Sequence, residues 1–181
     1  TSVPEGITVC RNAADAEKAL KRGEKVLYFV GKDEIKNTIP LGFTTVFWNY
    51  EFTNHQAPRT MGVLCNPNDP CLHDFVTDYY TNWQWFDLIK NAKPMILDSI
   101  QRKVEPIIRV IDDWNTNNSL GLLFEAKVGS GSLLVCSIDL FDHLEARPVA
   151  RQLLYSILNY MDGKSFDPSA SLDGEEIERM L

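Results

Sequence analysis

The chain has 181 residues, of which 44% are hydrophobic and 24% charged, a composition typical of one globular domain with a substantial core. Its formal net charge is −7, and no basic run is present, which excludes nucleic acid and anionic membranes as expected partners. No apolar run is long enough to insert into a bilayer. The chain begins with Thr1 rather than Met, as a processed product or an excised domain would.

The first thirty residues predict a strand, a helix and a second strand. Asn12 is a good N-cap with Asp15 three residues later, and Gly23 is a plausible end for the helix. The apolar run "KVLYFV" is typical of a strand buried on both faces. We therefore expect half of a parallel α/β unit here.

The middle of the chain predicts short strands around an aromatic region. The strand candidates are "FTTVFWN" (43–49), "MGVLCN" (61–66) and "PMILD" (94–98). Between the second and third lies the aromatic region, part of which we expect to be helical, with six aromatic residues in twelve: Phe75, Tyr79, Tyr80, Trp83, Trp85 and Phe86. Exposed Trp faces beside Asn82 would suit a sugar. Packing in the core or against a neighbouring domain also explains the large aromatic residues, and we favour packing.

The last third predicts a hairpin and a covering helix. Strands are expected at Ile107–Ile111, Leu120–Lys127 and Leu133–Ile138, and Gly129–Ser132 is the turn between the last two, which we expect to be antiparallel. A single apolar stripe between Pro148 and Gly163 predicts a helix. We expect one α/β domain over residues 1–165, a three-layer sandwich with a mixed sheet. Residues 166–181 form a polar acidic tail with room for one short helix.

The acidic pair Asp112-Asp113 is the first candidate for chemistry. Adjacent residues on a strand point to opposite faces, so the two carboxylates cannot share one substrate, although Asp139 or Asp142 could supply a partner. The favoured interpretation is that strand-end Asp residues cap loops. Since there is no glycine-rich phosphate loop and no metal-ligand spacing, we expect no cofactor and no metal.

The four cysteines offer a second candidate. Cys10 and Cys136 lie in apolar runs and are expected to be buried thiols, while Cys65 and Cys71 could form a disulfide in an oxidising compartment. Cys65 could also act as a nucleophile with His73 or His143 as its base. No glycine lies two residues after Cys65, so this possibility is the less favoured one.

Two long segments carry a family resemblance. "MGVLCNPNDPCLHDFVTDYYTNWQWFDLI" and "PIIRVIDDWNTNNSLGLLFEAKVGSGSLLVCSIDL", together with "RPVARQLLYSILNYM", resemble the C-terminal region of Bacteroidetes glycoside hydrolases of family 2, the β-galactosidase and β-glucuronidase-like enzymes. The resemblance covers roughly residues 26–161.

The resemblance implies a fold and a role. It implies a class I glutamine amidotransferase-like (flavodoxin-like) accessory domain, also found as the β-galactosidase trimerisation domain, with the catalytic glutamates in a TIM barrel elsewhere. The expected partner is the remainder of a glycoside hydrolase chain or its oligomer, in the periplasm or at the cell surface. An active amidotransferase would need a Gly-x-Cys-x-Gly elbow and a downstream His-x-Glu pair, and we interpret the sequence as having neither.

A crevice is expected where the central strand ends. We predict that Asp112, Trp114, Asn115 and Asp139 lie close together there, with some of Asn82, Trp83 and Trp85 beside them. We expect Trp114 to be a buried structural residue. The expected role is a non-catalytic accessory or interaction domain of a larger carbohydrate-degrading enzyme. The alternatives are a carbohydrate-binding module that uses Trp83, Trp85 and Trp114, and a small hydrolase that uses Cys65 or an Asp pair.

Overall fold

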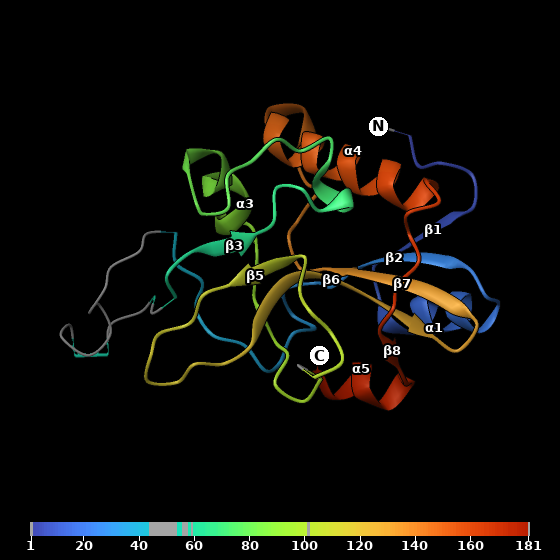
Figure 1. The fold of residues 1–181 in the computed structure, drawn as a ribbon, viewed down its shortest axis with the longest axis horizontal. Helices are drawn as coiled ribbons and strands as arrows, with labels where there is room; N and C mark the ends of the chain where they lie inside the picture. The colour runs from blue at the N-terminus through green and yellow to red at the C-terminus, as the bar shows by residue number, and fades with distance from the viewer. Residues whose placement is uncertain (1, 44–53, 56–57, 59, 101, 181) are drawn as a thin grey trace.

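The computed structural model describes residues 2–43, 54–55, 58, 60–100 and 102–180, and they form an α/β domain (Figure 1). Its mixed sheet has eight strands in the order β1-β2-β7-β6-β5-β3, with β4 and β8 also paired to β6. Four α-helices pack on the sheet in the part of the chain that is described. The bounds are β1 Ile7–Cys10, α1 Ala13–Lys21, β2 Lys25–Phe29, β3 Val63–Cys65, α3 Phe86–Lys90, β4 Met95–Ile96, β5 Ile108–Val110, β6 Leu120–Val128, β7 Gly131–Cys136, α4 Pro148–Asp162, β8 Ser171–Leu172 and α5 Gly174–Met180.

The first unit forms as the local sequence predicts. The side chain of Asn12 accepts a hydrogen bond from the Asp15 amide at 2.9 Å, which satisfies one of the free donors at the start of α1. Gly23 follows the helix with φ +80°, a left-handed conformation that glycine adopts without steric cost. The chain then returns as β2, which is parallel to β1.

The pairing of the strands changes from parallel to antiparallel between β7 and β6. Strands β1, β2 and β7 are parallel to one another, whereas β6 is antiparallel to β7, β5 and β4. The predicted antiparallel pairing of the last two long strands is confirmed, and the turn is at Gly129-Ser130. One expectation is wrong: β5, which precedes the acidic pair, is not central but second from the edge, and its pairing with β6 shifts register between Ile108 and Arg109.

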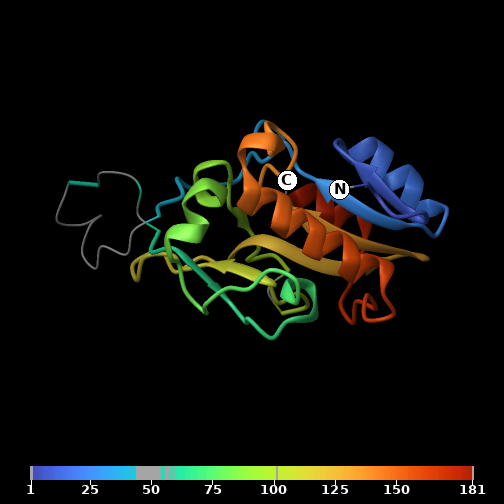
Figure 2. The same ribbon diagram turned by 90° about the horizontal axis from the view of Figure 1, so that it is seen from above.

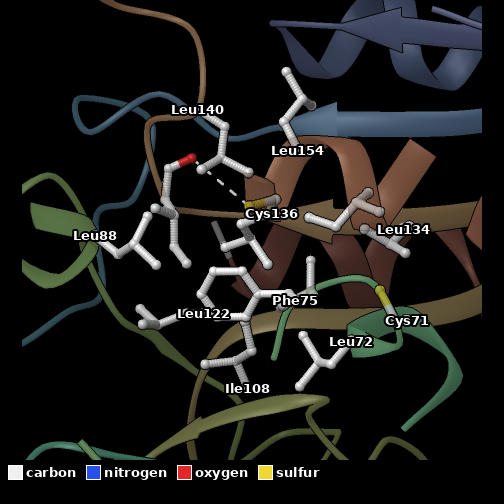
Figure 3. Packing of buried hydrophobic residues seen from close by; sticks show 14 of the residues in the cluster. Cys71, Leu72, Phe75, Leu88, Ile108, Leu122, Leu134, Cys136, Leu140 and Leu154 are labelled. Carbon is white, nitrogen blue, oxygen red and sulfur yellow. Dashed lines mark hydrogen bonds between the residues drawn. The ribbon is translucent and has the colours of Figure 1, made fainter. Parts of the chain in front are cut away.

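Helices cover both faces of the sheet, with α4 and α3 on one side and α1 and α5 on the other (Figure 1), and α4 lies across the sheet when it is viewed from above (Figure 2). Two apolar cores lie between these helices and the sheet. The larger core lies under α4 and α3 and contains Phe75 and Trp85 together with side chains from β5, β6 and β7. In Figure 3, Phe75 lies among Leu122, Ile108 and Leu72, and Cys136 donates to the Ile138 carbonyl at 3.6 Å. The smaller core lies against α1 and includes Tyr28 and Phe124.

The polar tail is bound to the sheet. The expected short helix is present as α5, and residues Ser171–Leu172 form an additional strand, β8, which pairs in parallel with the end of β6. Leu172 is buried in the smaller core, and Lys103 holds Glu176 at 2.6 Å. The strand predicted at residues 43–49 lies, apart from Phe43, outside the described residues. Within the described part of the chain, no helix is long and apolar enough to cross a membrane.

Candidate functional site

The loop after β5 is organised by the two carboxylates of the acidic pair. Asp113 accepts hydrogen bonds from the Asn115 and Thr116 amides at 2.8 and 3.1 Å, and Asp112 accepts from the amide and the side chain of Asn118 at 2.8 and 2.7 Å. These contacts confirm the interpretation that the strand-end acids cap a loop. They also hold the turn at residues 114–116 that follows β5.

The expectation that Asp112 and Asp113 point to opposite faces is wrong. The Thr116 hydroxyl lies 2.8 Å from one carboxylate and 2.9 Å from the other, so the two groups converge on one oxygen. They converge because β5 ends at Val110, and the alternation of a strand no longer applies beyond that residue. A hydroxyl has one proton and can donate to only one of the two carboxylates at a time.

A polar cavity of about 910 Å³ opens beside this loop. Asp112, Asn117 and Asn118 form one part of its wall, and Arg109 on β5 forms another. Trp114 and Asn115 are exposed in the same loop. The expectation that Trp114 is buried is wrong, because 51% of its surface is exposed, so its side chain contributes little to the core.

Asp139 follows β7 and caps a different turn. Its carboxylate accepts from the Phe141 and Asp142 amides at 3.0 Å each. Burial alone would raise the pKa of Asp139, but these two hydrogen bonds and the positive charge of Arg147 outweigh burial and hold the pKa below its ordinary value. Asp139 and Asp112 line different cavities, so the structure divides the predicted crevice into two places.

Arg147, which the sequence did not single out, connects several segments at this end of the molecule. Its guanidinium donates to Asp87 on α3 at 2.7 Å and to the carbonyls of Asp139 and Asp142 at 2.9 and 3.0 Å. Only 10% of its side chain is exposed. The residue directly precedes Pro148 at the start of α4, and this position is the only local signal of its role.

The two tryptophans of "WQW" have opposite environments. Trp85 is fully buried, packs edge-on against Phe75 at 5.4 Å and donates its indole N–H to Thr77 at 2.9 Å. This burial confirms packing for Trp85 and removes it from any sugar-binding surface. Trp83 is 80% exposed, while Asn82 accepts from the Gln84 amide and so caps the short turn between the two.

Segment 76–86 presents an exposed aromatic surface. We use this name for the five side chains that project from the segment into solvent: Val76, Tyr79, Tyr80, Trp83 and Phe86. The segment is held by the hydrogen bond from Gln84 to the Val76 carbonyl at 2.9 Å. Its residues 79–80 also run along the outer edge of β3, where the Cys65 amide donates to the Tyr79 carbonyl.

The environment of Cys65 does not favour a nucleophile. Its thiol lies 3.5 Å from the Asp78 carbonyl, and burial raises its pKa to about 11, whereas a catalytic thiol needs a lowered pKa. The interpretation that the sequence lacks a His-x-Glu pair is wrong, since His143-Leu144-Glu145 has that spacing. His143 follows β7, however, and β3 lies three strand spacings away in the sheet, roughly 14 Å.

The remaining thiols are structural. All four cysteines, Cys65 and Cys71 included, are free and buried, so the disulfide considered above is not formed. Burial raises the pKa of Cys136 to about 12 and that of Cys71 well above its ordinary value. Among the described residues, no group of three or more His, Cys, Asp or Glu side chains is arranged to hold a metal ion.

Comparison with known proteins gives a family without an assigned activity. No curated protein matches the chain. Residues 8–181, which run from the second residue of β1 through α5, match the family described as a domain of unknown function, DUF8487. The chain therefore belongs to the DUF8487 family.

Proposed function

We propose that this chain is a non-catalytic interaction domain of a larger carbohydrate-degrading glycoside hydrolase, where it packs against the remainder of that chain or of its oligomer. The observation that carries the proposal is the aromatic surface. Aromatic side chains present about 150–250 Å² each, so the exposed fractions of Tyr79, Tyr80, Trp83 and Phe86 correspond to roughly 500 Å². Surfaces rich in exposed aromatic side chains are typical of protein contact sites.

The size of the aromatic surface suits the centre of an interface. A stable interface buries about 800 Å² on each partner, with aromatic residues in its middle and a polar rim around them. The ring centres of Trp83 and Phe86 lie 6.2 Å apart, and the Phe43 ring packs against both. The acidic residues Asp74 and Asp78 belong to the same part of the chain and would contribute to the rim.

The family resemblance supplies the finer part of the proposal, a class I glutamine amidotransferase-like domain of a family 2 enzyme. The parallel unit β1-α1-β2, the late hairpin and the helices on both faces support that assignment. Strands β6 and β3 run opposite to β1, β2, β7 and β5, which departs from an all-parallel flavodoxin-like sheet.

The proposal that the domain is non-catalytic is supported by the hydrogen bonds of its candidate carboxylates and by the burial of its candidate thiol. The carboxylates of Asp112, Asp113 and Asp139 cap backbone amides, and burial raises the pKa of the Cys65 thiol. We expect the isolated chain not to hydrolyse aryl β-galactosides, aryl β-glucuronides or glutamine above background. Turnover that disappears in Asp112→Asn or Cys65→Ala would contradict the proposal.

The positive test uses the complete gene product. We expect the gene to encode a TIM-barrel hydrolase module in addition to this domain. In that protein, the double variant Trp83→Ser, Phe86→Ser should lose the packing of this domain, seen as faster limited proteolysis at its boundary or as a smaller mass in light scattering. The matched control is Tyr155→Ser, which changes an exposed aromatic residue on α4. A gene without a hydrolase module, or a double variant that packs like the wild type, would refute the proposal.

A carbohydrate-binding module is the second candidate. The observation in its favour is that Trp83 and Trp114 are exposed, and that Trp114 belongs to the loop beside the 910 Å³ polar cavity. Sugar binding there should be weak, with a Kd on the order of 1 mM. Loss of galactose or glucuronic acid binding in Trp114→Ala, with an unchanged melting temperature, would favour this function over the first.

A further inference from the structure

Three parallel strands end at one small cavity. Strands β1, β2 and β7 lie side by side in the sheet (Figure 1), and the cavity of about 380 Å³ is lined by Arg11 after β1, Gly31 and Lys32 after β2, and Ile138 and Phe141 after β7. Open α/β sheets hold their ligands at the carboxyl ends of such strands. The volume is in the range of small-molecule sites.

Arg11 is positioned in this cavity by an aromatic ring. Its guanidinium carbon lies 4.0 Å from the centre of the Phe141 ring, and that ring packs edge-on against Phe29 at 4.3 Å. No carboxylate among the described residues forms an ion pair with Arg11. A guanidinium stacked on a ring keeps the N–H groups at its edge available, in a fork that fits a carboxylate.

The loop after β2 supplies a second cation on a fixed backbone. Lys93 donates to the carbonyls of Lys32 and Ile35 at 2.6 and 2.8 Å, and the Gly31 amide donates to Glu34 at 2.9 Å. The Lys32 side chain itself is exposed, and no acidic partner for it is found in the described part of the chain. Two cations without partners therefore line one cavity.

The rest of the lining limits the charge and shape of a ligand. The Asp139 carboxylate is engaged by backbone amides and lies 3.9 Å from Arg147, which leaves Asp142 as the exposed carboxylate on this cavity. An anion with one negative charge is therefore favoured over a dianion. Phe29 and Ile138 are almost fully buried and offer a ligand little surface, whereas the half-buried Phe141 presents an apolar surface that suits an organic body.

We propose that this cavity binds a small organic molecule through its carboxylate group. The carboxylate pairs with the edge of the Arg11 guanidinium, Lys32 adds a second positive charge, and the organic body lies against the half-buried Phe141. The site is separate from the aromatic surface, and the inference does not depend on the interaction role proposed above.

The test is calorimetric titration of the protein with benzoate, with inorganic phosphate as a second probe. We expect benzoate to bind with a Kd on the order of 1 mM. Arg11→Gln should weaken binding at least about 10-fold, since a charge-assisted pair is lost, and Arg11→Lys should fall between because it keeps the charge and loses the fork. Lys32→Gln should weaken binding a few-fold. The matched control is Arg151→Gln, an exposed arginine on α4 that does not line the cavity.

Several outcomes would overturn the proposal. One is the absence of benzoate binding at 50 times the expected Kd, and another is benzoate binding that Arg11→Gln and Lys32→Gln leave unchanged. Binding of phosphate but not benzoate, abolished by Arg11→Gln, would overturn the assignment to a carboxylate. Melting curves of each variant separate loss of binding from loss of folding, and Lys32→Gln remains informative if Arg11→Gln unfolds.

Discussion

Replacement of Trp85 by Ala should destabilise the domain far more than replacement of Trp83, two residues away. Trp85 is fully buried against Phe75, and truncation of a buried Trp costs about 3–5 kcal/mol. The lost hydrogen bond to Thr77 adds about 1 kcal/mol. With a urea m-value of about 2 kcal/mol/M, the unfolding midpoint of Trp85→Ala should fall by about 2–3 M.

Trp83→Ala is the matched control, because it removes the same side chain from a position that is 80% exposed. Its free energy of unfolding should change by about 0.5 kcal/mol or less. Urea denaturation followed by far-UV circular dichroism measures both variants, and equal m-values would show that only stability changed. Equal destabilisation by the two substitutions would refute the opposite environments assigned to the two tryptophans.

Three further predictions follow from single contacts. Because burial raises the pKa of Cys65 to about 11 and that of Cys136 to about 12, a disulfide reagent at pH 8 should label no thiol of the folded chain and all four in urea. Because the folded-state pKa of Asp139 is lowered, its contribution is present above the unfolded pKa of about 3.9 and is lost as pH falls through the folded pKa. Asp139→Asn should therefore lose less stability than the wild type between pH 5 and pH 2 in urea titrations, and an identical acid limb would contradict this. Asp113→Ala should cost about 2–3 kcal/mol by removing two amide caps, against no measurable cost for Asp33→Ala; a urea midpoint equal to that of the control would show that the caps do not hold the loop.

Much of the fold could be predicted because its signals are local. The Asn12 cap, the Gly129-Ser130 turn and the apolar stripe of α4 each depend on residues that lie close together in the sequence. The position of β5 could not be predicted in this way. An apolar run shows that a strand is buried, but its place in the sheet depends on pairing with distant segments, here β6 and β3.

The candidate site was predicted less well, and the two tryptophans show why. Residues two apart lie on the same face of a strand, but in a 3₁₀ turn of three residues they point in different directions. Trp83–Trp85 forms such a turn, so one ring enters the core and the other faces solvent. Without the turn, "WQW" alone does not reveal which ring is buried.

The acidic and basic residues that follow the strands play different parts in their loops. A carboxylate after a strand finds backbone amides two or three residues later, as Asp113 and Asp139 do, and its lone pairs are then engaged within its own loop. A guanidinium has no acceptor and cannot cap an amide, and the Arg11 guanidinium lies over the Phe141 ring instead. In this fold the acids that follow strands are therefore explained by the loops they close, whereas Arg11, the cation that follows β1, is left with capacity for a ligand. A search that takes carboxylates at strand ends as functional residues therefore finds loop caps in this fold. The proposed binding site depends instead on Arg11 and Lys32.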